Sequence, residues 1–158
     1  MMTIKIAIAG SSGRMGQMLI EAIWNANDAQ LTVALDRVGS EAIGRDATAF
    51  LGQTSGVLIT DQLSALKEAD VLIDFTRPEG TLMHLQVCQE LGVKMIIGTT
   101  GFDEAGRAMI SAASQKIAIV SAYNMSVGVN LVFKLLEIAA GVLNQGYDAE
   151  IVEMHHKH

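Results

Sequence analysis

IKIAIAGSSGRMG, residues 4–16, joins an apolar β-rich run to a glycine-rich turn, and a helical pattern follows at once. Glycine lets the chain turn sharply and lets phosphate oxygens approach the backbone. The free N–H groups and the positive end of the following helix attract an anion. The segment therefore predicts a strand, a turn and a helix that bind the pyrophosphate of a dinucleotide. Because the spacing is G-x-x-G-x-x-G and not the commoner G-x-G-x-x-G, a turn that binds nothing is the alternative.

The rest of the chain alternates short β-rich runs with helical patterns, which is typical of a parallel sheet with crossover helices. We expect an α/β fold with a doubly wound, mostly parallel Rossmann-type sheet and helices on both faces. The expected strands are 4–9, 30–36, 57–60, 71–75, 94–97, 117–121 and 149–154. The expected helices are 15–26, 63–68, 80–91, 104–114 and 127–143, and residues 38–56 are expected to form an irregular connection.

Several residues suit the ends of these helices. Asp61 and Asp103 can act as N-caps, Pro78 suits a first helical turn, and Gly92 suits a helix end. Within the helix that follows Pro78, the sequence predicts that Cys88 is a small core residue and His84 a surface or partly buried one.

The composition excludes some classes of partner. The 158 residues are 50% hydrophobic and carry a formal net charge of -6, so the chain can bury a core and repels nucleic acid and anionic membranes. The single cysteine has no partner for a disulfide, and the N-terminal apolar run is too short for a signal peptide, so we expect a reducing, cytoplasmic setting. The apolar stretch 127–143 carries Asn130, Lys134 and Glu137 and is expected to be a helix that does not cross a membrane.

A carboxylate is expected to select the adenosine ribose. Asp36 ends the second expected strand about 20 residues after Gly16, where a carboxylate accepts hydrogen bonds from the ribose hydroxyls of NAD. Arg37 beside it, and Arg14 in the glycine turn, can pair with a ribose 2′-phosphate. We therefore expect both NADH and NADPH to bind, with some preference for NADH. The alternative is that Asp36 and Arg37 are a solvated loop pair.

Ligands of a doubly wound sheet lie outside the carboxyl ends of the strands. Three expected strands are followed there by small, hydroxyl or amide residues, in segments 76–81, 98–102 and 122–130. Each segment alone is ordinary turn chemistry. Because all three meet at one edge of the sheet, together they favour a site for the nicotinamide ribose and carboxamide.

The motifs GSSGRMG, LDR, DFTRPEGT, IIGTTGFD, YNMSVGVN and EMHHKH together resemble the 4-hydroxy-tetrahydrodipicolinate (dihydrodipicolinate) reductase family over essentially the whole chain. The resemblance implies that the pyrophosphate is held by Gly10, Ser11, Ser12, Gly13, Arg14 and Met15. It implies that Asp36 binds the adenosine ribose and Arg37 a 2′-phosphate. It places the nicotinamide against Gly98, Thr99 and Thr100, and against the backbone of Ala122, Tyr123, Asn124 and Met125.

The same resemblance implies the chemistry. The family reduces a cyclic, unsaturated dicarboxylate in lysine and diaminopimelate biosynthesis, with hydride from NADH or NADPH. Its catalytic segment reads H-H-x-H-K, so His155 is implied in acid/base catalysis and His156 in substrate binding, while His158 is the last residue before the expected lysine. Taken without the family, this histidine cluster would more simply be a tag remnant or an adventitious metal site, and no metal cofactor is expected.

Family members are longer, homotetrameric, and add an α+β domain that supplies most substrate contacts. We therefore expect residues 1–125 to form the dinucleotide-binding domain and 126–158 a crossover helix and first strand leading towards that second domain. The chain is expected to bind dinucleotide and to reduce substrate poorly. Two alternatives stay open, namely a Rossmann dehydrogenase of an amino or hydroxy acid, such as homoserine or aspartate dehydrogenase, and a non-catalytic nucleotide-binding module.

Overall fold

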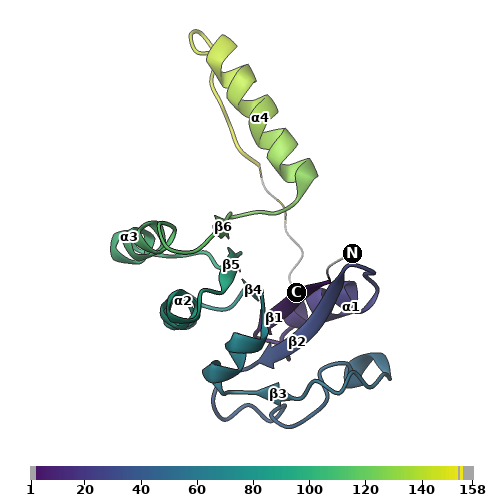
Figure 1. Ribbon diagram of the computed structural model, residues 1–158. Coiled ribbons are helices and arrows are strands. Elements are labelled where there is room, and N and C mark those ends of the chain that lie inside the picture. The colour runs from purple at the N-terminus through teal and green to yellow at the C-terminus, as the bar shows by residue number, and fades with distance from the viewer. Residues whose placement is uncertain (1–2, 153, 155–158) are drawn as a thin grey trace. The chain divides into compact units, whose positions relative to one another are not determined.

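The computed structural model describes residues 3–152 and 154 of the chain. It forms two compact units, Met1–Tyr123 and Asn124–His158. The first unit contains a six-stranded sheet in the order β3-β2-β1-β4-β5-β6, and every pair of neighbouring strands is parallel. The strands are β1 (Ile4–Ala9), β2 (Ala29–Leu35), β3 (Ile59–Thr60), β4 (Val71–Asp74), β5 (Lys94–Ile97) and β6 (Ile119–Ser121). This order is that of a doubly wound nucleotide-binding sheet, so the expected fold class is confirmed (Figure 1).

Helices lie between the strands, as crossover connections require. In the first unit these are α1 (Arg14–Trp24), α2 (Pro78–Leu91) and α3 (Glu104–Ala113), with short 3₁₀ helices η1 (Ala49–Leu51) and η2 (Leu63–Glu68). Three residues lie at the ends of helices as predicted. Pro78 starts α2, Gly92 ends it at φ 73°, and the carboxylate of Asp103 accepts a hydrogen bond from the Gly106 N–H at 2.7 Å.

The core has two parts, one on each face of the sheet. Successive residues of β1 divide between them, because Ala7 and Ala9 belong to one cluster and Ile8 to the other. Side chains of α2, α3 and η2 pack on the first face, and Ile20 and Ile23 of α1 pack on the second. Helices therefore cover both faces, as the fold class predicts.

Cys88 is fully buried in this core, as predicted. Burial, together with the negative charge of Asp74, raises the pKa of its thiol to about 12. The thiol is therefore a packing group and no nucleophile at neutral pH.

Three expectations were wrong. Residues 63–68 form a 3₁₀ helix whose N-cap is Gln62, so Asp61 caps nothing. Residues 149–152 and 154 belong to no strand, because the second unit offers no neighbouring strand in its described residues with which they could pair. His84 is 8% exposed and lies in the core beside a carboxylate, where the apolar pattern of its helix gave no sign of a polar partner.

The second unit contains α4 (Val127–Val142). Ser126 caps this helix by accepting from the Val129 N–H at 3.4 Å, and Asn130 Nδ2 donates to the carbonyl oxygens of Asn124 and Ser126. Across the described residues, 3–152 and 154, we find no helix with the length and apolarity that crossing a membrane demands.

Residues 38–56 are irregular as expected, and one carboxylate organises them. Asp46 accepts hydrogen bonds from the backbone and hydroxyl of Thr48, from both groups of Ser55, and from the Gly56 N–H, at 2.8 to 3.1 Å. Burial acts to raise the pKa of Asp46, but these hydrogen bonds outweigh it and hold the pKa well below its ordinary value. The loop therefore depends on an ionised Asp46.

Asp46→Asn is expected to destabilise the protein by about 1–2 kcal/mol at pH 7, because an amide cannot accept all five hydrogen bonds. Since the folded-state pKa is lowered, this contribution is complete above the ordinary value of 3.8 and is lost as the pH falls below it. Urea unfolding at pH 7 and pH 2.5 measures both effects. Asp61→Asn is the control, because within the described residues Asp61 accepts a single side-chain hydrogen bond, from the neighbouring Gln62. Equal stabilities of the two variants at pH 7 would contradict this role.

Candidate functional site

The glycine turn between β1 and α1 is very tight. Gly10 has φ 69°, in the left-handed region that favours glycine, and a Cβ on it would lie 3.0 Å from Thr76 Cγ2. Gly16 is buried, and a Cβ there would lie 2.1 Å from the Gly10 carbonyl oxygen. Glycine at position 16 thus lets α1 start directly against the end of β1.

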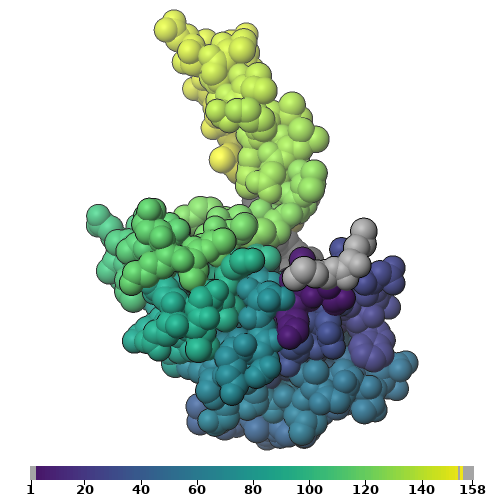
Figure 2. Space-filling model, viewed as in Figure 1, coloured from purple at the N-terminus to yellow at the C-terminus, as the bar shows by residue number. Residues whose placement is uncertain are grey.

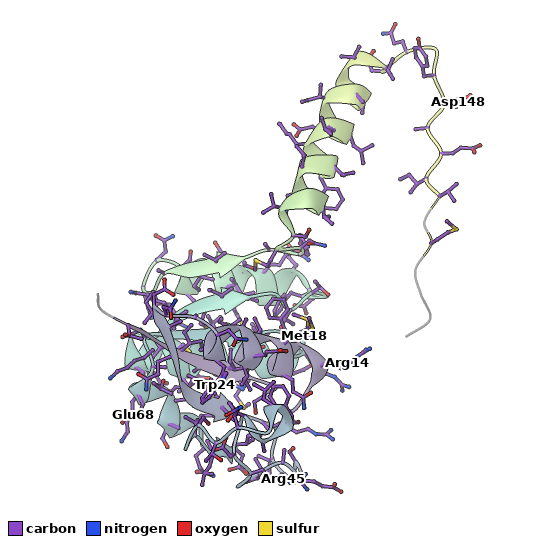
Figure 3. All side chains as sticks on the ribbon, turned by 90° about the vertical axis from the view of Figure 1, so that its right-hand side faces the viewer. Arg14, Met18, Trp24, Arg45, Glu68 and Asp148 are labelled. Atoms are coloured by element: carbon purple, nitrogen blue, oxygen red, sulfur yellow. The ribbon has the colours of Figure 1, made fainter. Side chains whose placement is uncertain are left out.

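The start of α1 is left open to an anion. Gly13 is the N-cap and makes no side-chain cap hydrogen bond, and the first turn carries no acidic residue. The N–H groups of a first helical turn have no partner within the helix, so those of Arg14 and Met15 are available to an external acceptor. Figure 3 shows Arg14 at the start of α1, with its side chain directed away from the rest of the unit.

Ser11 adds an independent sign of a ligand. Its side-chain oxygen is buried and has no hydrogen-bond partner in the described part of the chain. Buried hydroxyls are nearly always satisfied, so an unsatisfied one beside a glycine turn suits a ligand oxygen. The turn therefore fits a dinucleotide pyrophosphate in both charge and shape.

Asp36 follows β2 and lies directly beside this turn. One carboxylate oxygen accepts from the Ser12 N–H at 3.1 Å, and the other accepts from the Arg37 N–H at 2.8 Å. The Arg37 and Arg14 side chains are exposed. The structure thus brings together Gly10, Ser11, Ser12, Gly13, Arg14, Met15, Asp36 and Arg37, a group that contains one carboxylate and two exposed arginines.

A buried polar cluster lies at the ends of β4 and β5. Asp74, the last residue of β4, is 0% exposed, and its carboxylate lies 2.7 Å from His84 Nδ1 on α2. It also accepts from the Thr76 hydroxyl at 2.6 Å and the Thr99 hydroxyl at 3.4 Å, and Thr81 donates to Thr99 at 2.9 Å. We call Asp74, Thr76, Thr81, His84 and Thr99 the Asp74 cluster.

Sequence reasoning expected segments 76–81 and 98–102 to meet at one edge of the sheet. It placed Asp74 within a strand and His84 at or near the surface, and so missed the buried carboxylate that links these segments. An aspartate that ends an apolar strand, with a threonine two residues later, was the available signal, because such a pair forms a local side-chain turn. The contribution of His84 could not be read from spacing, since it lies ten positions further along the chain.

Burial acts to raise the pKa of Asp74, but hydrogen bonds from His84 and Thr76 and the charge of His84 outweigh it, so the pKa stays below its ordinary value. The carboxylate is therefore ionised at neutral pH inside the protein core.

A cleft of about 340 Å³ opens between the segments that follow β5 and β6 and the helix α3. Thr99, Ala122 and Tyr123 line it, so the structure brings these three predicted residues together. Gly98 and Thr100 flank Thr99, and Thr100 is exposed. Figure 2 shows the surface of the first unit, where teal residues lie between the purple residues near the N-terminus and green residues that come later in the chain.

The other predicted site residues, Asn124, Met125, His155 and His156, come after the first unit in the chain. Asn124 and Met125 belong to the second unit, where Asn124 Oδ1 accepts from the Ser126 N–H at 2.8 Å. His155 and His156 lie outside the described residues. Among the residues that are described, no group of three or more His, Cys, Asp or Glu could hold a metal ion.

Comparison with curated proteins finds close relatives. The chain is 66% identical over 153 residues to the 4-hydroxy-tetrahydrodipicolinate reductase of Bordetella parapertussis, covering 97% of this chain and 57% of the relative. It is 64% identical to the protein of the same name from Herminiimonas arsenicoxydans, covering 98% of this chain and 58% of the relative. The chain thus spans a little under three fifths of the length of these relatives.

Solved structures and family models agree with this. The fold matches a dipicolinate-bound dihydrodipicolinate reductase from Paenisporosarcina sp. TG-14 with a TM-score of 0.71 and 26% identity, over 88% of this chain and 54% of that one. The family model described as dihydrodipicolinate reductase, N-terminus, matches residues 4–125, and the one described as its C-terminus matches 128–158. With most of its length matched in this way, the chain belongs to the dihydrodipicolinate reductase family.

Proposed function

We propose that this chain is the dinucleotide-binding part of a reductase that converts 4-hydroxy-tetrahydrodipicolinate to tetrahydrodipicolinate in lysine and diaminopimelate biosynthesis. Residues 1–125 form the domain that binds NADH or NADPH, and residues 126–158 lead into the substrate domain. One observation carries the proposal. A glycine turn with an open helix start and an unsatisfied buried Ser11 hydroxyl lies beside the Asp36 carboxylate.

Each part of the cofactor has a matching group. The N–H groups at the start of α1 and the Ser11 hydroxyl hold the pyrophosphate, and Asp36 accepts from the ribose hydroxyls. The cleft lined by Thr99, Ala122 and Tyr123 receives the nicotinamide end. When bound, the dihydronicotinamide supplies hydride, and the protein orients it and shields it from water.

The proposal extends to the whole protein. His155 moves a proton and His156 binds the cyclic dicarboxylate substrate, because both match the family's His-His motif. The whole enzyme is a cytoplasmic homotetramer that acts on a small molecule and binds neither nucleic acid nor membrane. The family membership and the 66% identity to a curated reductase support these statements.

Fluorescence titration tests the proposal directly. NADH added to the chain should show a blue-shifted and enhanced emission that saturates, and ADP-ribose should compete for the same site. Saturable binding with similar dissociation constants for NADH and NADPH supports the proposal. Absence of saturable NADH binding, or a thousandfold preference for NADPH, would contradict it.

Arg37→Ala is expected to weaken NADPH binding about tenfold and to leave NADH binding within twofold, because only NADPH carries a 2′-phosphate for the exposed guanidinium. Arg45→Ala is the matched control, since Arg45 is an exposed arginine in the irregular 38–56 connection, and it should change neither constant. If Arg37→Ala weakened the binding of NADH and NADPH equally, Arg37 would not be the group that binds the 2′-phosphate.

A further inference from the structure

The Asp74 cluster occupies a special place in the sheet. In the parallel ladders Asp74 is the partner of Ala9 on one side and of Ile97 on the other. The residues that follow these two partners are Gly10 of the glycine turn and Gly98 of the proposed nicotinamide segment. The cluster thus lies between the two segments that are proposed to hold opposite ends of the cofactor.

One arm of the cluster reaches the glycine turn. The Thr76 hydroxyl donates to Asp74 at 2.6 Å, and the Thr76 N–H donates to the same oxygen at 2.9 Å. This fixes the Thr76 methyl group so close to Gly10 that a Cβ on Gly10 would meet it at 3.0 Å. Thr76 therefore limits the position of Gly10 from the side of β4.

A second arm reaches the cleft. The Thr99 hydroxyl lies 3.4 Å from the Asp74 carboxylate and accepts from the Thr81 hydroxyl at 2.9 Å, and all three side chains are buried. The Gly98 N–H donates to the Asp74 carbonyl oxygen at 2.9 Å. The segment that lines the cleft is thus held to Asp74 by both backbone and side chain.

His84 completes the cluster from α2. Its Nδ1 lies 2.7 Å from the second carboxylate oxygen, which leaves the first oxygen to the two threonines. A buried hydrogen bond adds little net stability, because both partners give up hydrogen bonds to water. An orienting role explains better why a hydrogen-bonded polar pair lies at this point of an otherwise apolar strand end.

We propose that His84 is a positioning residue for the dinucleotide site, which acts through Asp74 on Thr76 and Thr99 and so sets the distance between the pyrophosphate turn and the nicotinamide cleft. This inference rests on the proposed function, because it assumes that these two segments hold the two ends of one dinucleotide. His84 itself touches no cofactor.

The test compares NADH with ADP-ribose, which lacks the nicotinamide, as probes of the two arms. His84→Leu removes the hydrogen bond to Asp74 and should weaken NADH binding about tenfold, but ADP-ribose binding only about threefold, since the Thr99 arm acts on the nicotinamide end alone. His84→Asn keeps an N–H donor near the position of Nδ1 and should restore most of the NADH affinity. Dissociation constants are measured well below the melting temperature of each variant.

Leu85→Ala is the matched control, because Leu85 is buried on the same helix but belongs to the apolar core and not to the cluster. It should lower the melting temperature and leave both dissociation constants unchanged. Should His84→Leu fail to fold, His84→Gln takes its place, because its amide nitrogen lies near the position of Nε2 and not of Nδ1, and so does not donate to Asp74. Loss of NADH affinity is then expected for the glutamine variant and not for the asparagine variant.

The outcomes separate the two claims. No binding of NADH by the unaltered chain would overturn the proposed function and this inference with it. Normal binding by the unaltered chain, with variants of His84 that lower the melting temperature but change neither constant, would overturn the positioning role alone. Selective loss for NADH with rescue by asparagine supports it.

Discussion

Gly16→Ala should reduce NADH affinity by at least tenfold and destabilise the protein by about 1–3 kcal/mol. A methyl group there would lie 2.1 Å from the Gly10 carbonyl oxygen and 2.8 Å from Ser11 Cα. Both atoms are backbone, so no side chain can rotate to make room, and the turn itself must move. Movement of the turn displaces the N–H groups that are proposed to hold the pyrophosphate. NADH titration and urea unfolding measure the two effects.

Gly141→Ala is the control for this variant. Gly141 also lies within a helix, and a Cβ on it would meet nothing within 4 Å. Because alanine favours a helix over glycine, this change should leave NADH binding intact and stabilise α4 by up to about 1 kcal/mol. A Gly16→Ala protein that binds NADH as the unaltered chain does would show that the tight turn is not needed for binding.

Asp74→Ala is expected to destabilise the protein by about 3–5 kcal/mol at pH 7, because the buried His84 ring and the Thr76 and Thr99 hydroxyls lose their acceptor, at about 1–3 kcal/mol for each unsatisfied group. This is a large part of the stability of a domain of this size. Urea unfolding followed by circular dichroism measures the loss.

The stability lost in Asp74→Ala should depend on pH and become smaller in acid. Since the folded-state pKa of Asp74 is below its ordinary value of 3.8, its contribution is complete above that value and is lost as the pH falls below it. The difference between Asp74→Ala and the unaltered chain should therefore shrink below pH 3.8. Asp70→Ala is the control, because Asp70 is exposed and its carboxylate accepts one hydrogen bond in the part of the chain that the structure describes, from the Lys5 N–H at 2.8 Å. A loss no larger than that of Asp70→Ala would contradict the account of the cluster.

The sequence predicted the sheet well because buried parallel strands are short apolar runs with few other interpretations. β1 and β5 have the expected bounds, β2 starts and ends one residue earlier than expected, and β4 ends one residue earlier. β3 and β6 each start two residues later than expected. The strand expected at 149–154 is not found in its described residues, 149–152 and 154, because a β-rich run does not by itself supply a partner strand. Asp61 failed as a cap because residues 63–68 form a 3₁₀ helix that starts after Gln62.

The sequence predicted those parts of the candidate site that lie within short, contiguous motifs. The glycine turn and Asp36 follow from spacing alone, and the structure brings them into contact through the Ser12 N–H. The Asp74 cluster was not predicted, because its members come from β4, α2 and the segment after β5 and meet only in the folded sheet. His84 shows the limit most clearly, since a histidine in an apolar helix gives no local sign of a buried carboxylate partner.

The most direct test of the central claim is a crystal structure of this chain with NADH. The account predicts the pyrophosphate within hydrogen-bond distance of the N–H groups of Arg14 and Met15, the ribose on Asp36, and the nicotinamide beside Thr99. NADH bound elsewhere, with the turn after Ala9 empty, would contradict it.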